Sequence, residues 1–159
     1  MVGILEYKIS TVKLTFSIYS SSVRTDRQTP QLEEGIKMTG THVTVVYKWT
    51  AHPGKLDELK SIYEEVTAAM KQNEPDAQAV HCFVSEKDNA LYVRDEFKDA
   101  AAMGLHLSTT AAGHFPQLLA IAVPGPFFFF GDVPDELQQA TEQMQLGGEF
   151  STHAFGFDR

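Results

Sequence analysis

Hydrophobic and polar residues alternate along three short segments of the chain. These are residues 42–50 (HVTVVYKWT), 79–86 (AVHCFVSE) and 91–97 (LYVRDEF). Such alternation is typical of strands with one buried face. The second and third segments are joined by a tight polar connection, which predicts a hairpin. Between the first and second, residues 56–72 carry apolar side chains at helical spacing and predict an amphipathic helix.

The second half of the chain continues with helical patterns and two further strands. An acidic residue followed by alanines predicts a helix over 99–108, and Thr109 or Thr110 is the expected cap of a second short helix with Pro116 in its first turn. PGPFFFFG predicts a fourth strand. Residues 132–144 predict a helix capped by Asp132, and residues 149–157 a last strand.

This order, β-α-β-β-α-β with an α-β tail, predicts an α+β fold of the ferredoxin-like split βαβ type. Its antiparallel sheet would have helices on one face. The FFFF strand places Phe on both faces, so neither face of that strand is suited to water. Two sheets packed face to face in a symmetric homodimer would cover the second face.

The pattern divides the chain into three parts. Residues 1–39 form an N-terminal extension with one strand pattern and a polar linker, 40–131 form the main domain, and 132–159 form a C-terminal helix-strand extension packed on the same domain. The extension is either an added strand or a non-native start, with Met38 as the natural first residue.

Charge and cysteine content narrow the classes of partner. The net charge is −8 without a basic stripe, which disfavours nucleic acids and anionic membrane surfaces. We find no apolar run of about 20 residues and no signal peptide, so a cytoplasmic protein is expected. Cys82 is the single cysteine, and its alternation with Val80 and Val84 predicts a buried side chain.

Two stretches of the chain, VTVVYKWTAHPGKLDELKSIYEE and DEFKDAAAMGLHLST, carry a resemblance to a known family. The first resembles the first strand, Pro-Gly turn and first helix of the antibiotic biosynthesis monooxygenase (ABM) family. The second resembles that family's acidic strand end and the helix that ends in His-Leu-x-Thr/Ser. The resemblance is to the quinol monooxygenase branch in particular. The resemblance covers roughly residues 42–131. It implies a dimeric α+β barrel whose oxygenase members oxidise phenolic or quinol aromatics with O₂ and without a metal or flavin, so no cofactor is expected.

Two positions depart from the oxygenases of the family. Phe97 stands where they usually carry Trp, and Val93 stands where those acting on aromatic polyketides carry Asn. Phe has no N–H donor and Val has no polar group, so the hydrogen bonds proposed for those enzymes are lost. The departures favour a second hypothesis, a non-catalytic dimeric protein that binds a small ligand.

His106 is the leading candidate for a catalytic group. It lies at the C-terminal end of the predicted helix, where it either caps or packs, or serves as a general base toward a phenolic proton. Asp95 shares a strand face with apolar residues and therefore needs a partner if buried. It either lies in solvent or caps the next helix, or it orients His106.

The remaining candidates line a predicted pocket for a small aromatic substrate. Tyr47, Trp49, Phe97 and Met103 are either core residues or walls that stack on a flat ligand, and His114 lies near them in sequence. In one continuous helix, His106 and His114 would lie about 12 Å apart along the axis, so we predict no metal site.

Overall fold

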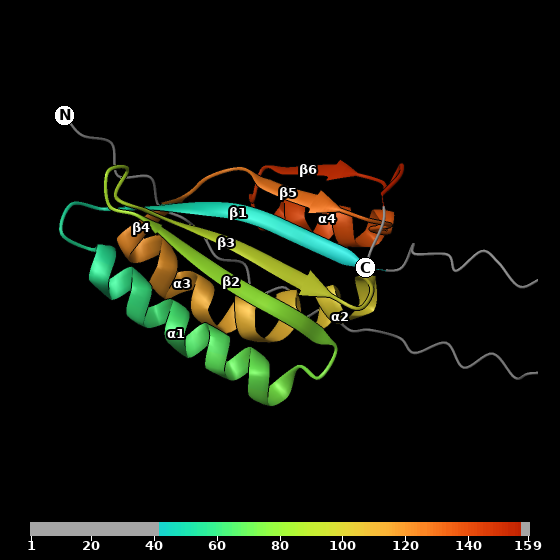
Figure 1. Cartoon of the computed structure of the whole chain (residues 1–159), viewed down its shortest axis with the longest axis horizontal. Coiled ribbons are helices and arrows are strands. Elements are labelled where there is room, and N and C mark those ends of the chain that lie inside the picture. The colour runs from blue at the N-terminus through green and yellow to red at the C-terminus, as the bar shows by residue number, and fades with distance from the viewer. Residues whose placement is uncertain (1–41, 157–159) are drawn as a thin grey trace, which may run out of the picture. The chain divides into compact units, whose positions relative to one another are not determined.

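A computed structural model describes residues 42–156 of the 159-residue chain. The expected N-terminal extension therefore lies outside the described residues. The strands are β1 (Val43–Ala51), β2 (Ala77–Ser85), β3 (Ala90–Phe97), β4 (Ala122–Pro124), β5 (Phe127–Phe130) and β6 (Gly148–Ser151). The helices are α1 (Leu56–Asn73), α2 (Ala100–His106), the π-helical turn η1 (Leu107–Ala111), α3 (Ala112–Ile121) and α4 (Asp135–Gln143) (Figure 1). Among the described residues, no helix combines the length and hydrophobicity needed to cross a membrane.

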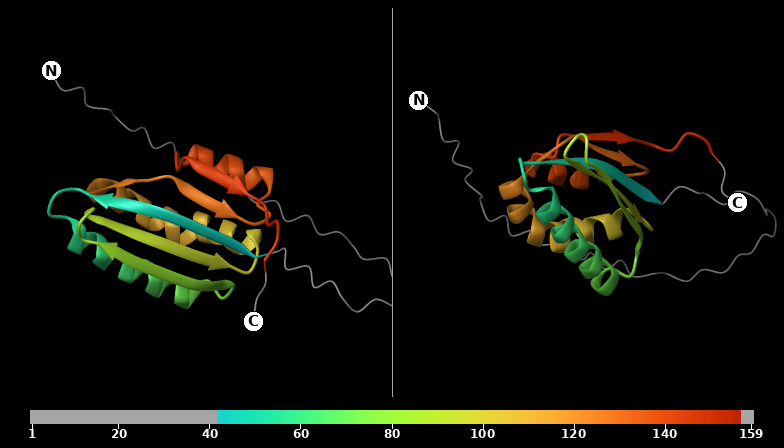
Figure 2. Two further views of the ribbon diagram at one scale, coloured as in Figure 1. Left: turned by 45° about the horizontal axis from the view of Figure 1, so that its top comes forward. Right: turned by 60° about the vertical axis from the view of Figure 1, so that its left-hand side comes forward.

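The strands form one sheet in the order β2-β3-β1-β5-β6, and the short β4 pairs with β1. All pairings are antiparallel except that of β5 with β6, which is parallel. Helices α1, α2 and α3 lie against one face of the sheet (Figure 2). This is the predicted α+β, ferredoxin-like split βαβ arrangement, with β6 as the exception to the expected antiparallel sheet.

Helix α1 forms because its apolar stripe has a sheet to cover. The buried residues of α1 are the six that the helical spacing predicts, namely Leu56, Leu59, Ile62, Tyr63, Val66 and Met70. They pack in one core with the inward face of the sheet, where every second residue of β1 is buried. Burial of each large apolar side chain contributes roughly 1.5–3 kcal/mol, so this layer supplies much of the stability of the domain.

The two helices expected on either side of residues 108–113 are one continuous helical run. Asp99 caps α2 by accepting a hydrogen bond from the Ala102 N–H at 2.9 Å. The run then passes through η1 into α3 without a break, so the expected cap at Thr109 or Thr110 is wrong. The Thr109 hydroxyl instead donates to the Leu105 carbonyl one turn back. Pro116 lies inside α3 rather than in a first turn.

Three smaller expectations are also wrong. Cys82 is exposed because β2 is the edge strand of the sheet and has a neighbouring strand on one side only. Asp132 does not cap α4, whose N-cap is Pro134. The expected last strand is shorter than 149–157 and ends at Ser151.

The turn after α4 has a strained residue. The Gln145 N–H donates to the Glu142 carbonyl at 2.9 Å, and the Leu146 N–H donates to the Thr141 carbonyl at 3.3 Å. These two bonds form a Schellman motif, in which the residue at the position of Gln145 takes a left-handed conformation and is usually Gly. Gln145 has a φ of 57°, which a side chain makes costly.

We expect Gln145→Gly to raise the free energy of unfolding by about 1 kcal/mol, because glycine adopts a positive φ without a steric penalty. Urea denaturation monitored by circular dichroism measures the change. Gln139→Gly is the matched control, since Gln139 is an exposed residue in the middle of α4. That variant should lose about 0.5–1 kcal/mol. A loss of stability in Gln145→Gly would contradict the assignment of strain.

Candidate functional site

A cavity lies between the inward face of the sheet and the helices, with a volume of about 40 Å³. Every residue that the sequence predicts for the site lines it, although those residues come from β1, β3, α2 and α3. The predicted residues in the lining are Tyr47, Trp49, Asp95, Phe97, Met103, His106 and His114. The lining is mostly apolar, so its few polar atoms are the places where chemistry or ligand orientation can occur.

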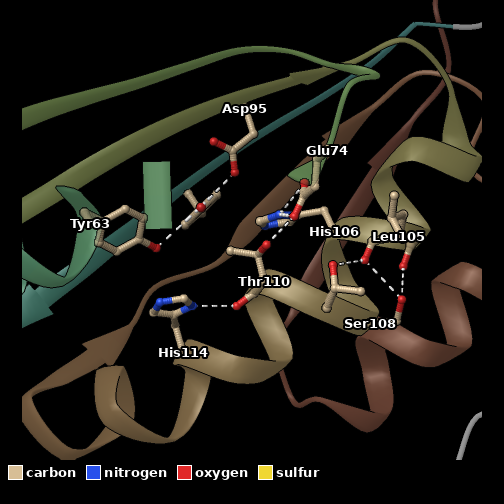
Figure 3. A network of polar contacts seen from close by, with 11 residues as sticks. Tyr63, Glu74, Asp95, Leu105, His106, Ser108, Thr110 and His114 are labelled. Atoms are coloured by element: carbon tan, nitrogen blue, oxygen red, sulfur yellow. Dashed lines mark hydrogen bonds and ion pairs between the residues drawn. The ribbon is translucent and has the colours of Figure 1, made fainter. Parts of the chain in front are cut away.

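His106 is held by a carboxylate that the sequence analysis did not identify. Its Nδ1 lies 3.1 Å from Oε2 and 3.3 Å from Oε1 of Glu74, and both side chains are buried. The Thr110 hydroxyl donates a short hydrogen bond to the same carboxylate (Figure 3). A carboxylate accepts but does not donate, so Nδ1 of His106 carries a proton and Nε2 of the neutral ring is left as the acceptor.

Glu74 occupies the C-cap position of α1, where the helix meets α2 and η1. Burial acts to raise its pKa, but the hydrogen bonds from His106 and Thr110 outweigh burial and lower it. Glu74 is therefore a carboxylate at neutral pH. Removing one member of such a buried pair is costly, because the other is left uncompensated.

Glu74 had a signal in the sequence. It follows Met70 by four residues, so it continues the apolar stripe of α1 onto the buried side of the chain. A charged residue at a stripe position predicts a buried charge that needs a partner. The identity of that partner depends on tertiary packing, since His106 and Thr110 are more than 30 residues away.

Asp95 is buried, with 2% of its surface exposed, and its hydrogen-bond partner is Tyr47 rather than His106, which one hypothesis expected. Its Oδ2 accepts a hydrogen bond from the Tyr47 hydroxyl at 2.8 Å. The expectation that Asp95 lies in solvent or caps a helix is wrong, because β3 carries it into the core beside Val93 and Phe97. The carboxylate that orients His106 is that of Glu74.

The Tyr47 hydroxyl belongs to a chain of polar groups that ends at Asp95. Nε1 of Trp49 donates to the Tyr63 hydroxyl at 2.5 Å, and the Tyr63 hydroxyl lies 3.4 Å from that of Tyr47. An indole N–H only donates, so the hydroxyl protons of the chain all point toward Asp95. Burial raises the pKa of Asp95 to about 6, although the charge of His106 and the hydrogen bond from Tyr47 act in the opposite direction.

His114 is also fixed through Nδ1, which lies 2.8 Å from the Thr110 carbonyl oxygen. A carbonyl only accepts, so Nδ1 carries the proton here too. The η1 turn lies between His106 and His114 and changes their angular separation from that of a regular α-helix, and both line the cavity. Turns of π-helix are rare and occur frequently at functional sites.

Aromatic rings surround these polar groups. The Phe97 ring lies 5.4 Å from the His106 ring, and the Phe127 ring stacks on that of Tyr47 at 4.4 Å. Met144 and Leu146, on either side of the strained Gln145, supply a further wall from the C-terminal segment. Among the described residues, no group of three or more His, Cys, Asp or Glu side chains is arranged to hold a metal ion.

Comparisons with known proteins establish the fold. No model of a known protein family matches the chain, and no curated protein matches it either. MupZ from Pseudomonas fluorescens is similar in structure, with a TM-score of 0.64 at 13% identity over 75% of this chain and 95% of that chain. SnoaB, a cofactor-independent oxygenase from Streptomyces nogalater, has a TM-score of 0.51 at 21% identity over 59% of this chain and 95% of that chain.

A putative antibiotic biosynthesis monooxygenase from Bacteroides thetaiotaomicron has a TM-score of 0.50 at 14% identity and covers 60% of this chain and 90% of that chain. The chain therefore has the α+β fold of the antibiotic biosynthesis monooxygenases, as the sequence resemblance implied.

The raised pKa of Asp95 makes stability depend on pH. The folded state holds the Asp95 proton more tightly than the unfolded state, so this residue's contribution to stability falls as pH rises from about 4 to about 6. A pKa raised from 3.8 to about 6 corresponds to about 3 kcal/mol. We expect Asp95→Asn to gain about that much relative to the wild type between pH 4 and pH 7.

Urea denaturation of both proteins at several pH values measures this difference. Asp132→Asn is the matched control, because Asp132 is exposed. It should follow the wild type at every pH. A difference between wild type and Asp95→Asn that is the same at pH 4 and pH 7 would show that Asp95 titrates normally.

Proposed function

We propose that this chain is a cofactor-independent monooxygenase that acts on a small aromatic phenol or quinol, with His106 as the general base. The observation that carries the proposal is the fixed Nδ1 of His106, which leaves Nε2 as an acceptor beside an aromatic-lined cavity. Histidine is suited to removing a phenolic proton because its ordinary pKa lies near neutrality. The fold shared with SnoaB, a cofactor-independent oxygenase, supports the same reaction class.

The reaction would begin with transfer of the phenolic proton to Nε2 of His106. The resulting phenolate is electron-rich and reacts with O₂ at a ring carbon. One oxygen atom enters the ring, and the other leaves as water together with two hydrogens from the substrate. The substrate supplies all the electrons, so the protein has to position the ring, accept a proton and exclude water. Buried Glu74 stabilises the imidazolium that forms.

Binding of an aromatic ring requires the cavity to widen. A cavity that holds benzene is roughly 150 Å³, compared with about 40 Å³ here. The lining residues that are only half-buried mark the side from which a ligand would enter, and they are Leu107, Ala111, His114, Phe115 and Met144. Met144 is suited to this adjustment because methionine is unbranched and flexible.

A non-catalytic ligand-binding protein of the same fold is the second candidate. Phe97 favours it, because its ring lies against His106 at a position where the oxygenases of the family usually carry a Trp with an N–H donor. Such a protein would bind an aromatic ligand at the same cavity without consuming O₂.

We expect the protein to consume O₂ when incubated with at least one of a panel of substituted hydroquinones. An oxygen electrode follows the reaction. His106→Ala should lower the rate by at least 100-fold, because general-base catalysis contributes about 10²–10⁴-fold. His52→Gln is the control, since His52 is an exposed residue of the turn between β1 and α1.

Uptake that His106→Ala leaves unchanged would remove His106 from the mechanism. An absence of uptake across the panel, together with a bound aromatic detected by native mass spectrometry, would favour the ligand-binding protein.

We also propose that the chain forms a homodimer through the face of the sheet opposite the helices. This face carries exposed large apolar side chains, including Phe83, Tyr92, Val123 and Phe130. Aromatic side chains are enriched at protein interfaces. The half-buried Val46 lies among them on the central strand β1.

Size-exclusion chromatography with light scattering should give twice the mass of the 17.7 kDa chain at micromolar concentration. Tyr92→Glu should shift the protein to monomer, because it places a charge in the proposed interface. Leu119→Glu is the matched control on α3, where Leu119 is 41% exposed on the helical side. A monomeric wild type would contradict the proposal.

A further inference from the structure

Asp95 and His106 are separate proton-transfer groups in the lining of the cavity, whereas removal of a phenolic proton requires only one such group. Asp95 lies on β3, in the sheet, and His106 lies at the end of α2, in the helical layer. Figure 3 shows the two side chains on different elements around the same space. A ligand between the layers would therefore meet a carboxyl group on one side and an imidazole on the other.

The free oxygen of Asp95 is Oδ1. Oδ2 accepts the hydrogen bond of the Tyr47 hydroxyl. The Tyr47 proton points to Oδ2 because the indole N–H of Trp49, at the other end of this series of hydrogen bonds, can only donate. Within residues 42–156, Oδ1 is buried and has no hydrogen-bond partner. A buried polar atom without a partner is costly and calls for a functional explanation. When Asp95 binds a proton, that proton belongs on Oδ1.

The free nitrogen of His106 is Nε2, because Glu74 holds Nδ1. The neutral ring can therefore accept a proton at Nε2 while the acid form of Asp95 donates one from Oδ1. A substrate uses both groups together only if it loses a proton at one atom and gains one at another. A ketone with a hydrogen on the adjacent carbon meets this requirement.

We propose that Asp95 and His106 form an acid–base pair that catalyses the reversible enolisation of a flat cyclic ketone, without oxygen. Nε2 of His106 takes the proton from the carbon beside the carbonyl, and the electron pair of that C–H bond forms the C=C bond of the enol. Oδ1 of Asp95 delivers its proton to the carbonyl oxygen. Return of a proton to carbon completes the cycle with no net oxidation. This inference rests on the proposed role of His106 as a base, but not on the reaction with O₂.

The tyrosines hold Asp95 for this role. Tyr47 contacts the carboxylate directly, and Tyr63 and Trp49 fix Tyr47. Tyr47 and Tyr63 also hold their own protons firmly, since burial raises the pKa of each hydroxyl. Asp95 is therefore the member of the chain that exchanges a proton at ordinary pH, and Tyr47 is a positioning residue.

The test is hydrogen–deuterium exchange of 1-indanone in deuterated buffer under argon, followed by the loss of the α-proton signal in ¹H NMR. The wild type should exceed the buffer rate at least tenfold. Asp95→Asn and His106→Gln should each lower the enzymatic rate at least tenfold, because acid–base groups contribute about 10²–10⁴-fold. The exposed-site variants His52→Gln and Asp132→Asn should keep the wild-type rate.

The pH profile separates acid catalysis by Asp95 from a structural role. The reaction requires the acid form of Asp95 together with the neutral form of His106, so the enzymatic rate should pass through a maximum. On the alkaline side of this maximum the rate should fall as pH rises through about 6, where Asp95 loses its proton. The titratable groups around Asp95 are Tyr47 on β1, Tyr63 on α1, Cys82 on β2 and His106 on α2, with Glu74 behind His106 and His114 across the cavity. Tyr47→Phe keeps both reacting groups and removes the hydrogen bond that lowers the pKa of Asp95. The fall in rate should therefore occur at a higher pH in this variant.

Exchange at the buffer rate in the wild type would overturn the proposal, as would an unchanged rate in folded Asp95→Asn. If the rate falls at the same pH in Tyr47→Phe as in the wild type, the assignment of this fall to Asp95 would be overturned. The oxygen reaction is judged separately. Uptake of O₂ without exchange rejects enolisation and leaves the oxygenase standing, whereas exchange without uptake supports enolisation and rejects the oxygenase.

Discussion

The buried contact between Glu74 and His106 is the constraint on which the site depends. Glu74 ends α1, and its carboxylate receives hydrogen bonds from the end of α2 and from η1. One side chain thus joins three helical segments at the point where they meet the cavity. The same contact sets the tautomer of His106 and so decides which nitrogen faces a ligand. Structural and chemical roles are combined in a single carboxylate.

The two buried carboxyl groups have opposite properties because their partners differ. Glu74 has two donors, one of them able to carry a charge, and its pKa is lowered. Asp95 has one neutral donor, Tyr47, and burial dominates, so its pKa rises to about 6. Divergent environments of this kind allow one pocket to hold an acid and a base near neutral pH. Asp95 lies in the mostly apolar lining of the cavity, where charges interact more strongly than in water, and Glu74 acts on the same cavity through His106.

Much of the fold could be predicted from periodicity, since the buried stripe of α1 and the inward face of β1 follow from spacing alone. The continuous helical run after Asp99 could not be predicted in this way. The hydroxyls of Ser108 and Thr109 donate to carbonyl groups of the preceding turn, and η1 continues the helix where a break was expected. The residues predicted for the site all line the cavity, but the hydrogen bonds that connect them were not predicted. Spacing along β3 indicates that Asp95 points inward, yet only packing brings Tyr47 to it and Glu74 to His106.

The central claim is that Glu74 fixes His106 with its proton on Nδ1 and its lone pair on Nε2. Long-range ¹H–¹⁵N correlation NMR of the uniformly labelled protein, at a pH where the ring is neutral, reports the protonation of both ring nitrogens directly. We predict a protonated Nδ1 and an unprotonated Nε2 for His106, with that preference weakened in Glu74→Gln. A protonated Nε2 beside an unprotonated Nδ1 in the wild type would contradict the account.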